Sequence, residues 1–194
     1  MFAQVILVLG LSATALSLHL GMCPEPTLDK AFDLEKFTGT WYLVEVSHNS
    51  MEALPKNCSQ FLIENITDTE ASVMHKFKSR ITKKWDTEFF EFTADEKEPG
   101  LLKFNVINGT KETLPFHKKF PLRVVDTDYD TYAILLACQE LFIFTRQDLY
   151  VIARAKSLDD EEKAEIYRIL NQKDLAPDPF RQMDHFSEEC REDE

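Results

Sequence analysis

Short runs of alternating hydrophobic and polar residues dominate the chain between residues 41 and 154. Turn-forming residues separate eight such runs, which are rich in β-branched and aromatic side chains: 41–47, 59–64, 71–81, 88–93, 101–107, 122–126, 131–137 and 148–153. No stretch of helical periodicity lies between them. The pattern predicts an antiparallel meander and excludes alternating βαβ units.

One amphipathic helix is predicted after the last run. Ser157 is placed to cap it, and Asp159 and Asp160 suit the positive end of the helix dipole. The helix is expected to end near Asn171, and its apolar stripe consists of Ala164, Ile166, Tyr167, Ile169 and Leu170. After a complete meander, such a stripe is expected to pack against the outside of the sheet.

The predicted fold is all-β, an eight-stranded up-and-down antiparallel barrel with one C-terminal helix outside. Up-and-down strands lose their exposed edges most completely when the sheet closes on itself. The interior of an eight-stranded barrel either fills with side chains or holds one small ligand. The motifs must decide between these two alternatives.

The chain of 194 residues begins with an uncharged apolar stretch. We interpret residues 1–17 as a signal peptide cleaved near Ala15 or Ser17. The alternative, an uncleaved anchor, has a stretch that is short for a membrane span. Residues 18–180 are then the folded domain, and residues 181–194 are an acidic tail tethered by Cys190. The mature protein is expected to be secreted and to have no membrane span.

Four cysteines follow this leader, Cys23, Cys58, Cys138 and Cys190, none in a CxxC spacing. Their even number and wide separation predict two disulfides in an oxidising compartment, with three pairings open. The five histidines show no metal-ligand or catalytic-triad spacing. We therefore expect no metal, no cofactor and no catalytic residues. The net charge of −12 argues against nucleic acid as a partner.

Three sequons for N-linked glycosylation begin at Asn57, Asn65 and Asn108. They agree with export, and Asn108 also opens an Asn-Gly turn. Asn57 is the weakest candidate, because a disulfide at Cys58 would restrict the acceptor.

Three blocks of sequence together resemble the lipocalin family. The first is Phe37-Thr38-Gly39-Thr40-Trp41-Tyr42, the second runs from Val125 through Thr127, Asp128 and Tyr132 to Ala133, and the third is Ile152-Ala153-Arg154. The resemblance covers nearly all of the mature chain, from Cys23 to Cys190. It implies that Gly39, Trp41, Thr127, Asp128, Tyr132 and Arg154 build the closed end of the barrel, with the Arg154 guanidinium stacked on Trp41.

Within the family, the cysteine positions are most similar to those of apolipoprotein D and the bilin-binding proteins. That similarity implies the pairs Cys23–Cys138 and Cys58–Cys190. The block from Asp126 to Ala133 is equally similar to plasma retinol-binding protein.

Strand alternation gives a candidate ligand lining. The inward residues are expected to be Leu43, Glu45, Ser47, Phe61, Ile63, Phe104, Val106, Ala133, Leu135, Tyr150 and Ile152. The same alternation turns Asn65 inward, where a glycan has no room. Either the strand ends before Asn65, or a bulge shifts the register, or the sequon is unused. Glu45 is the sharpest case, because a carboxylate in an apolar cavity needs a partner.

The lining predicts a secreted carrier of a small hydrophobic ligand, such as a lipid, a retinoid or a bilin-type pigment. One alternative is an extracellular scavenger of small mediators such as biogenic amines, which several acidic lining residues would favour. A second alternative, a prostaglandin-isomerase-like enzyme, needs a free thiol inside the cup. All four cysteines match disulfide positions, so we expect no enzyme.

Overall fold

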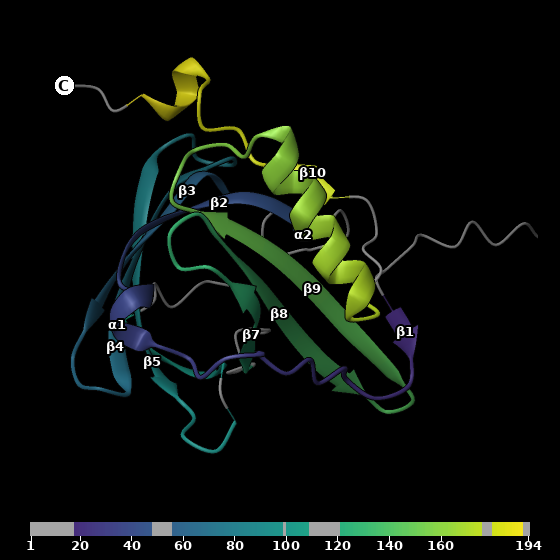
Figure 1. Ribbon diagram of the computed structural model, residues 1–194. Coiled ribbons are helices and arrows are strands. Elements are labelled where there is room, and N and C mark those ends of the chain that lie inside the picture. Colours follow the sequence, from purple (N-terminus) through teal and green to yellow (C-terminus); the bar gives the residue numbers. More distant parts are fainter. Residues whose placement is uncertain (1–17, 48–55, 99, 109–120, 176–179, 192–194) are drawn as a thin grey trace, which may run out of the picture.

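The computed structural model describes residues 18–47, 56–98, 100–108, 121–175 and 180–191 (Figure 1). Eight antiparallel strands follow one another along the chain: β2 (Gly39–Ser47), β3 (Lys56–Asn65), β4 (Glu70–Ser79), β5 (Trp85–Ala94), β6 (Leu101–Asn108), β7 (Leu122–Thr127), β8 (Tyr132–Leu141) and β9 (Phe144–Ala153). The last strand, β9, pairs with the first, β2, so the sheet closes into a barrel. The predicted fold class and all eight strands are confirmed.

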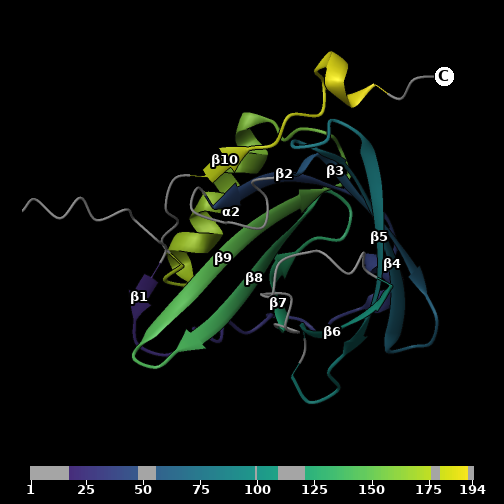
Figure 2. The same cartoon turned by 180° about the vertical axis from the view of Figure 1, so that it is seen from behind.

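Two short strands extend this barrel beyond the predicted meander. Strand β1 (Leu18–Leu20) pairs with the beginning of β9, and β10 (Phe180–Gln182) pairs with the end of β2. Figure 2 shows β10 beside β2. The short helix α1 (Leu34–Phe37) precedes β2, and the 3-10 helix η1 (Glu188–Cys190) follows β10.

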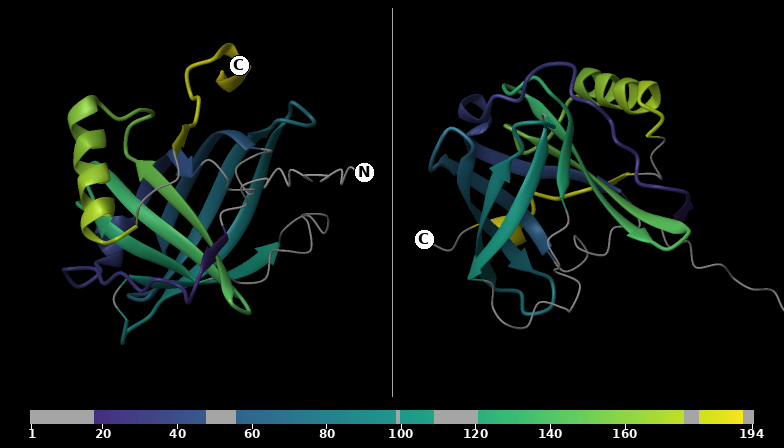
Figure 3. Two further views of the ribbon diagram at one scale, coloured as in Figure 1. Left: turned by 90° about the vertical axis from the view of Figure 1, so that its right-hand side faces the viewer. Right: turned by 90° about the horizontal axis from the view of Figure 1, so that it is seen from below.

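Two separate apolar clusters hold the molecule together. The inner one fills the barrel around Trp41 and includes side chains from α1 and from most strands. The outer one joins β2, β7, β8 and β9 to helix α2 (Asp160–Gln172), through Ile166, Ile169 and Leu170. Figure 3 shows α2 on the outside of the barrel, as the stripe predicts.

Helix α2 begins later than predicted. Its N-cap is Asp159, whose side chain accepts a hydrogen bond from the backbone N–H of Glu162 (2.8 Å), while Glu162 accepts one from the N–H of Asp159 (2.7 Å). The prediction of Ser157 as the cap was wrong. A capping box needs Glu or Gln three residues after the N-cap, to accept a hydrogen bond from the N-cap backbone N–H. Asp159 has Glu162 at that position, whereas Ser157 has Asp160, whose side chain is shorter.

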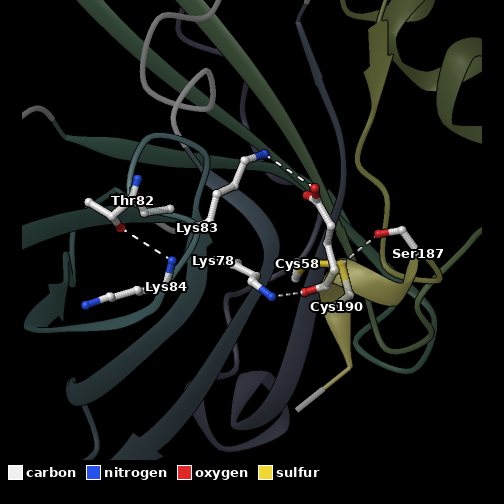
Figure 4. Close-up of polar contacts among 9 residues, drawn as sticks. Cys58, Lys78, Thr82, Lys83, Lys84, Ser187 and Cys190 are labelled. Carbon is white, nitrogen blue, oxygen red and sulfur yellow. Dashed lines mark hydrogen bonds and ion pairs between the residues drawn. A yellow bond between two sulfur atoms is a disulfide. The ribbon is translucent and has the colours of Figure 1, made fainter. Parts of the chain in front are cut away.

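Two disulfides tie the chain ends to the barrel, and both match the pairs that the resemblance implies. Cys23–Cys138 fixes the N-terminal segment to β8, and Cys58–Cys190 fixes η1 to β3. Around the second bond, the Lys78 ammonium donates to the Glu189 carbonyl (2.7 Å), as Figure 4 shows. No described residue belongs to a helix long and apolar enough to cross a membrane.

Residues 180–185 are part of the barrel wall. Met183 and His185 are buried, and the His185 ring lies 2.7 Å from the Leu43 carbonyl oxygen through Nε2. The acidic tail predicted from residue 181 therefore begins later, because β10 and its continuation run antiparallel to β2.

Candidate functional site

One end of the barrel is closed by a guanidinium clamp. The Arg154 guanidinium lies 3.7 Å from the centre of the Trp41 ring. It also donates hydrogen bonds to three backbone carbonyls, those of Tyr129 (3.0 Å), Thr40 (3.1 Å) and Lys36 (2.9 Å). Burial lowers the pKa of Arg154, while nearby carboxylates oppose that shift. The stacking that the resemblance implies is therefore present.

Local geometry at this end explains the glycine before Trp41. Gly39 has φ +95°, and a Cβ there would lie 3.2 Å from the Arg154 guanidinium. The Trp41 indole N–H donates to the Phe37 carbonyl (2.8 Å), which ties α1 to the ring. Any side chain at position 39 would be strained and would crowd the clamp.

The turn between β7 and β8 is held by one carboxylate. Asp128 Oδ1 accepts hydrogen bonds from the backbone N–H groups of residues 130, 131 and 132 at 2.8–3.1 Å. Thr127 Oγ1 donates to the Tyr132 carbonyl (2.7 Å), and the Tyr132 hydroxyl donates to Asp126 (2.7 Å). Burial, and then the hydrogen bond to Asp126, raises the pKa of Tyr132.

Most of the predicted lining residues belong to the inner cluster. Five are buried: Leu43, Ile63, Ala133, Leu135 and Ile152. Three are only half-buried: Phe61, Phe104 and Tyr150. The backbone of Val106 pairs with Phe90, another half-buried member of the inner cluster. In a closed barrel, the surface that such residues keep must face the interior or its mouth.

Two predicted lining residues lie elsewhere. A bulge between Leu43 and Glu45 interrupts the alternation, so Val44 and Glu45 both face the outer helix. Glu45 accepts a hydrogen bond from the Tyr167 hydroxyl of α2 (3.3 Å), and burial raises its pKa. Its predicted inward direction was wrong, because strict alternation from Trp41 assumes a strand without a bulge, and the bulge adds one residue before Glu45.

Ser47 lies beyond the bulge, one residue past the inward Val46, so alternation turns it outward. Its hydroxyl accepts a hydrogen bond from the backbone N–H of Leu149 (3.1 Å). Ser47 therefore links two strands of the wall, and its predicted inward direction was also wrong.

A polar chain on the inner face escaped the sequence analysis. Ser59 Oγ lies 2.6 Å from His75 Nε2, and His75 Nδ1 lies 3.3 Å from Glu88. The His75 ring also stacks on Phe61, with 4.4 Å between ring centres. A serine, a histidine and a carboxylate in this order form the relay of many hydrolases. Here Ser59 is 0% exposed, so its oxygen offers no surface to a substrate.

Charged residues also face inward from β9 and β10. Arg146 and Asp148 alternate with Tyr150 and form an ion pair at 2.9 Å. Arg181 of β10 pairs with Val46, an inner-cluster residue, and so shares its face. Alternation along β4, β5 and β9 would have predicted that His75, Glu88 and Asp148 face inward. Strand β10 has only three residues, which is too short for alternation to predict the direction of Arg181.

The predicted modification sites are placed as follows. Asn65 is the last residue of β3 and is exposed, even though its partner in the sheet, Ala71, is buried. Strand β3 reaches this position past the end of its pairing with β2, which begins at Gly39 opposite Ile63. Glycosylation at Asn57, Asn65 and Asn108 stays a prediction, as does the leader, because residues 1–17 lie outside the described part.

Within the described residues, no group of three or more histidine, cysteine or acidic side chains is arranged to hold a metal. All four cysteines are in disulfides.

Comparisons with known proteins agree with this geometry. The family model described as Nitrophorin matches residues 23–194. Apolipoprotein D of Rattus norvegicus is 26% identical over 163 residues, which cover 82% of this chain and 80% of the relative. Insecticyanin of the tobacco hornworm Manduca sexta superposes with a TM-score of 0.73 at 19% identity, covering 89% of this chain and 90% of its own. Lobster apocrustacyanin A1 gives 0.69 at 14% identity, covering 88% and 92%.

Proposed function

Because the chain belongs to the lipocalins, through the nitrophorin family that its residues 23–194 match, we propose that it is an extracellular carrier of a small hydrophobic molecule. The observation that carries this proposal is the set of half-buried apolar side chains directed into a closed barrel: Phe61, Phe90, Phe104, Leu122 and Tyr150. Aromatic side chains with accessible surface, enclosed by strands, suit an apolar guest. The two disulfides agree with an extracellular site of action.

The clamp around Trp41 has a different task. Its arginine donates to three backbone carbonyls and stacks on Trp41, so these groups close the end of the barrel. We assign these residues to stability and the half-buried aromatic residues to binding.

The test is a titration of delipidated mature protein with a fatty acid, a sterol, a retinoid and a bilin, followed by tryptophan quenching. Ala137→Trp should weaken binding at least tenfold, because alternation from Leu135 directs position 137 inward and the larger ring takes up interior space. Thr93→Trp, on the outer face beside the inward Phe92, is the matched control and should bind as the wild type does. Absence of saturable binding to all four ligands would contradict the proposal.

A scavenger of cationic amines is the second candidate. Glu88 and Asp148 are acidic and share the inner face, which favours it. However, His75 lies beside Glu88 and Arg146 beside Asp148, so each carboxylate already has a basic neighbour. Isothermal titration with amines and with fatty acids separates the two candidates.

A further inference from the structure

Strand β10 contributes Arg181 to the inner face of the barrel, beside side chains of β2 and β9. Val46 pairs with Tyr150 of β9 on one side and with Arg181 of β10 on the other. Residues paired across a sheet share a face, so Tyr150, Val46 and Arg181 form one row on three neighbouring strands. Met183, two residues further on, is in the inner cluster, whereas Phe180 packs in the outer one. Arg181 therefore points toward the interior at the level of Tyr150.

The Arg181 guanidinium is partly enclosed, and its two buried nitrogens lack a partner. Its Nε and Nη2 are buried and have no hydrogen-bond partner among the residues that the structure describes. Burial lowers the pKa of Arg181, and the positive charge of Arg80 lowers it further. A buried cation with unused donors is costly unless a group of opposite charge completes it.

Two other charged groups on the inner face each lie beside a group of opposite charge. Arg146 lies 2.9 Å from Asp148, and His75 lies 3.3 Å from Glu88. Arg80, the residue after β4, adds positive charge near Arg181. Among the residues that the structure describes, the buried Nε and Nη2 of Arg181 therefore have no partner, although the whole chain carries −12.

We propose that Arg181 is the anchor for an acidic group on the ligand, so that the cargo is an amphipathic anion. The inference rests on the proposed function and names its ligand class: an apolar chain or ring joined to one carboxylate or phosphate. The planar guanidinium offers parallel donors to two oxygens of such a group. The apolar part of the ligand lies against Tyr150 and the other half-buried aromatic side chains.

This assignment also separates the candidate ligand classes. A cationic amine meets repulsion from Arg181. A neutral lipid fills the apolar space but leaves Nε and Nη2 without partners, so its binding is weaker than that of the matching acid. An acid of the same chain length gains the charged contact.

The experiment compares three probes of equal chain length on delipidated protein: oleic acid, oleyl alcohol and 1-oleoyl lysophosphatidate. Two variants are compared with the wild type. Arg181→Met keeps the apolar part of the side chain and removes the charge. Arg181→Lys keeps the charge and removes the planar pair of guanidinium donors. Arg191→Met, in the exposed segment after η1, is the matched control. Isothermal titration calorimetry at a pH near 7.5 gives each Kd.

We expect Arg181→Met to weaken binding of the acids about ten- to a hundredfold and to leave oleyl alcohol within about twofold. Arg181→Lys should recover part of the loss, and Arg191→Met should change nothing. A larger loss for oleic acid than for the lysophosphatidate identifies a carboxylate site, and the reverse identifies a phosphate site. Ligand-free Arg181→Met should also melt at the wild-type temperature or above it, because an unpaired buried charge has been removed.

Equal affinity of the wild type for oleic acid and oleyl alcohol, with no change in Arg181→Met, would overturn the inference while leaving the carrier function intact. Absence of binding of all three probes and of the wider ligand panel would overturn the carrier function itself. If Arg181→Met does not fold, the same comparison of acid and alcohol on the wild type and on Arg181→Lys decides the question.

Discussion

Replacement of Arg154 by Met should destabilise the barrel strongly without affecting its cargo. The guanidinium donates three hydrogen bonds to carbonyls at 2.9–3.1 Å and lies 3.7 Å from the Trp41 ring. Hydrogen bonds from a charged donor contribute about 1.5–3 kcal/mol each, and a shielded cation–π contact about 1–2 kcal/mol. Carbonyls at this partly exposed end regain water in the variant, so the sum is an upper bound. We expect a loss of about 3–4 kcal/mol.

The assay is urea unfolding at neutral pH, followed by far-ultraviolet circular dichroism with both disulfides intact. In thermal unfolding the same loss corresponds to a decrease in Tm of roughly 6–16 °C for a domain of this size. Arg154→Lys keeps the charge but not the planar fork, so it should lose about half as much. Both variants should bind oleic acid like the wild type, because the clamp contributes no side chain to the row around Arg181.

A loss below about 1 kcal/mol in Arg154→Met would refute this reasoning. It would mean that the guanidinium acts as an ordinary surface charge and that Trp41 is held by packing alone. A double-mutant cycle with Trp41→Phe separates the stacking from the hydrogen bonds. A coupling energy near zero would assign the whole effect to the carbonyl contacts.

Two further predictions concern the outer wall and the C-terminal tether. Burial raises the pKa of Glu45 above 4.5, so the folded protein keeps this proton to higher pH than the unfolded chain does, and stability falls as pH rises through that interval. Glu45→Gln should match the wild type at about pH 4 and exceed its unfolding free energy at about pH 8, and equal pH profiles would contradict this. Removal of one disulfide by Cys58→Ser with Cys190→Ser should cost about 4–5 kcal/mol as an upper value, because the bond spans 132 residues. The same double variant should lose affinity for oleic acid as the segment that carries Arg181 is released, and calorimetry of Cys23→Ser with Cys138→Ser provides the control.

The strands and the outer helix could be predicted because their signals extend over many residues. Eight alternating runs fixed the meander, and Ile166, Ile169 and Leu170 marked the buried face of α2. By contrast, β1 and β10 are three residues each, which is too short for a period to be visible. Their pairing depends on edges that exist only after the barrel has formed.

The candidate site was predictable wherever the alternation continued without interruption. Phe61 and Ile63 on β3, and Tyr150 and Ile152 on β9, lie on the inner face as counted. One extra residue at Val44 reversed the direction of Glu45, and no local signal in the sequence marks that bulge. The inward polar residues His75 and Glu88 obey the alternation, but polar side chains on the inner face do not stand out in a pattern defined by apolar positions.

The location of Arg181 outside the eight-strand meander has a consequence for how ligand choice can diversify. Strand β10 lies in a segment that begins after α2 and is fastened at its far end by the Cys58–Cys190 bond. Arg181 makes no contact with the clamp around Trp41 and lies outside the eight-strand meander, whereas its neighbours Phe180 and Met183 pack in the outer and inner clusters. Position 181 can therefore vary while Phe180 and Met183 are retained, so that carriers with new cargo could be engineered, or could evolve, on a constant scaffold.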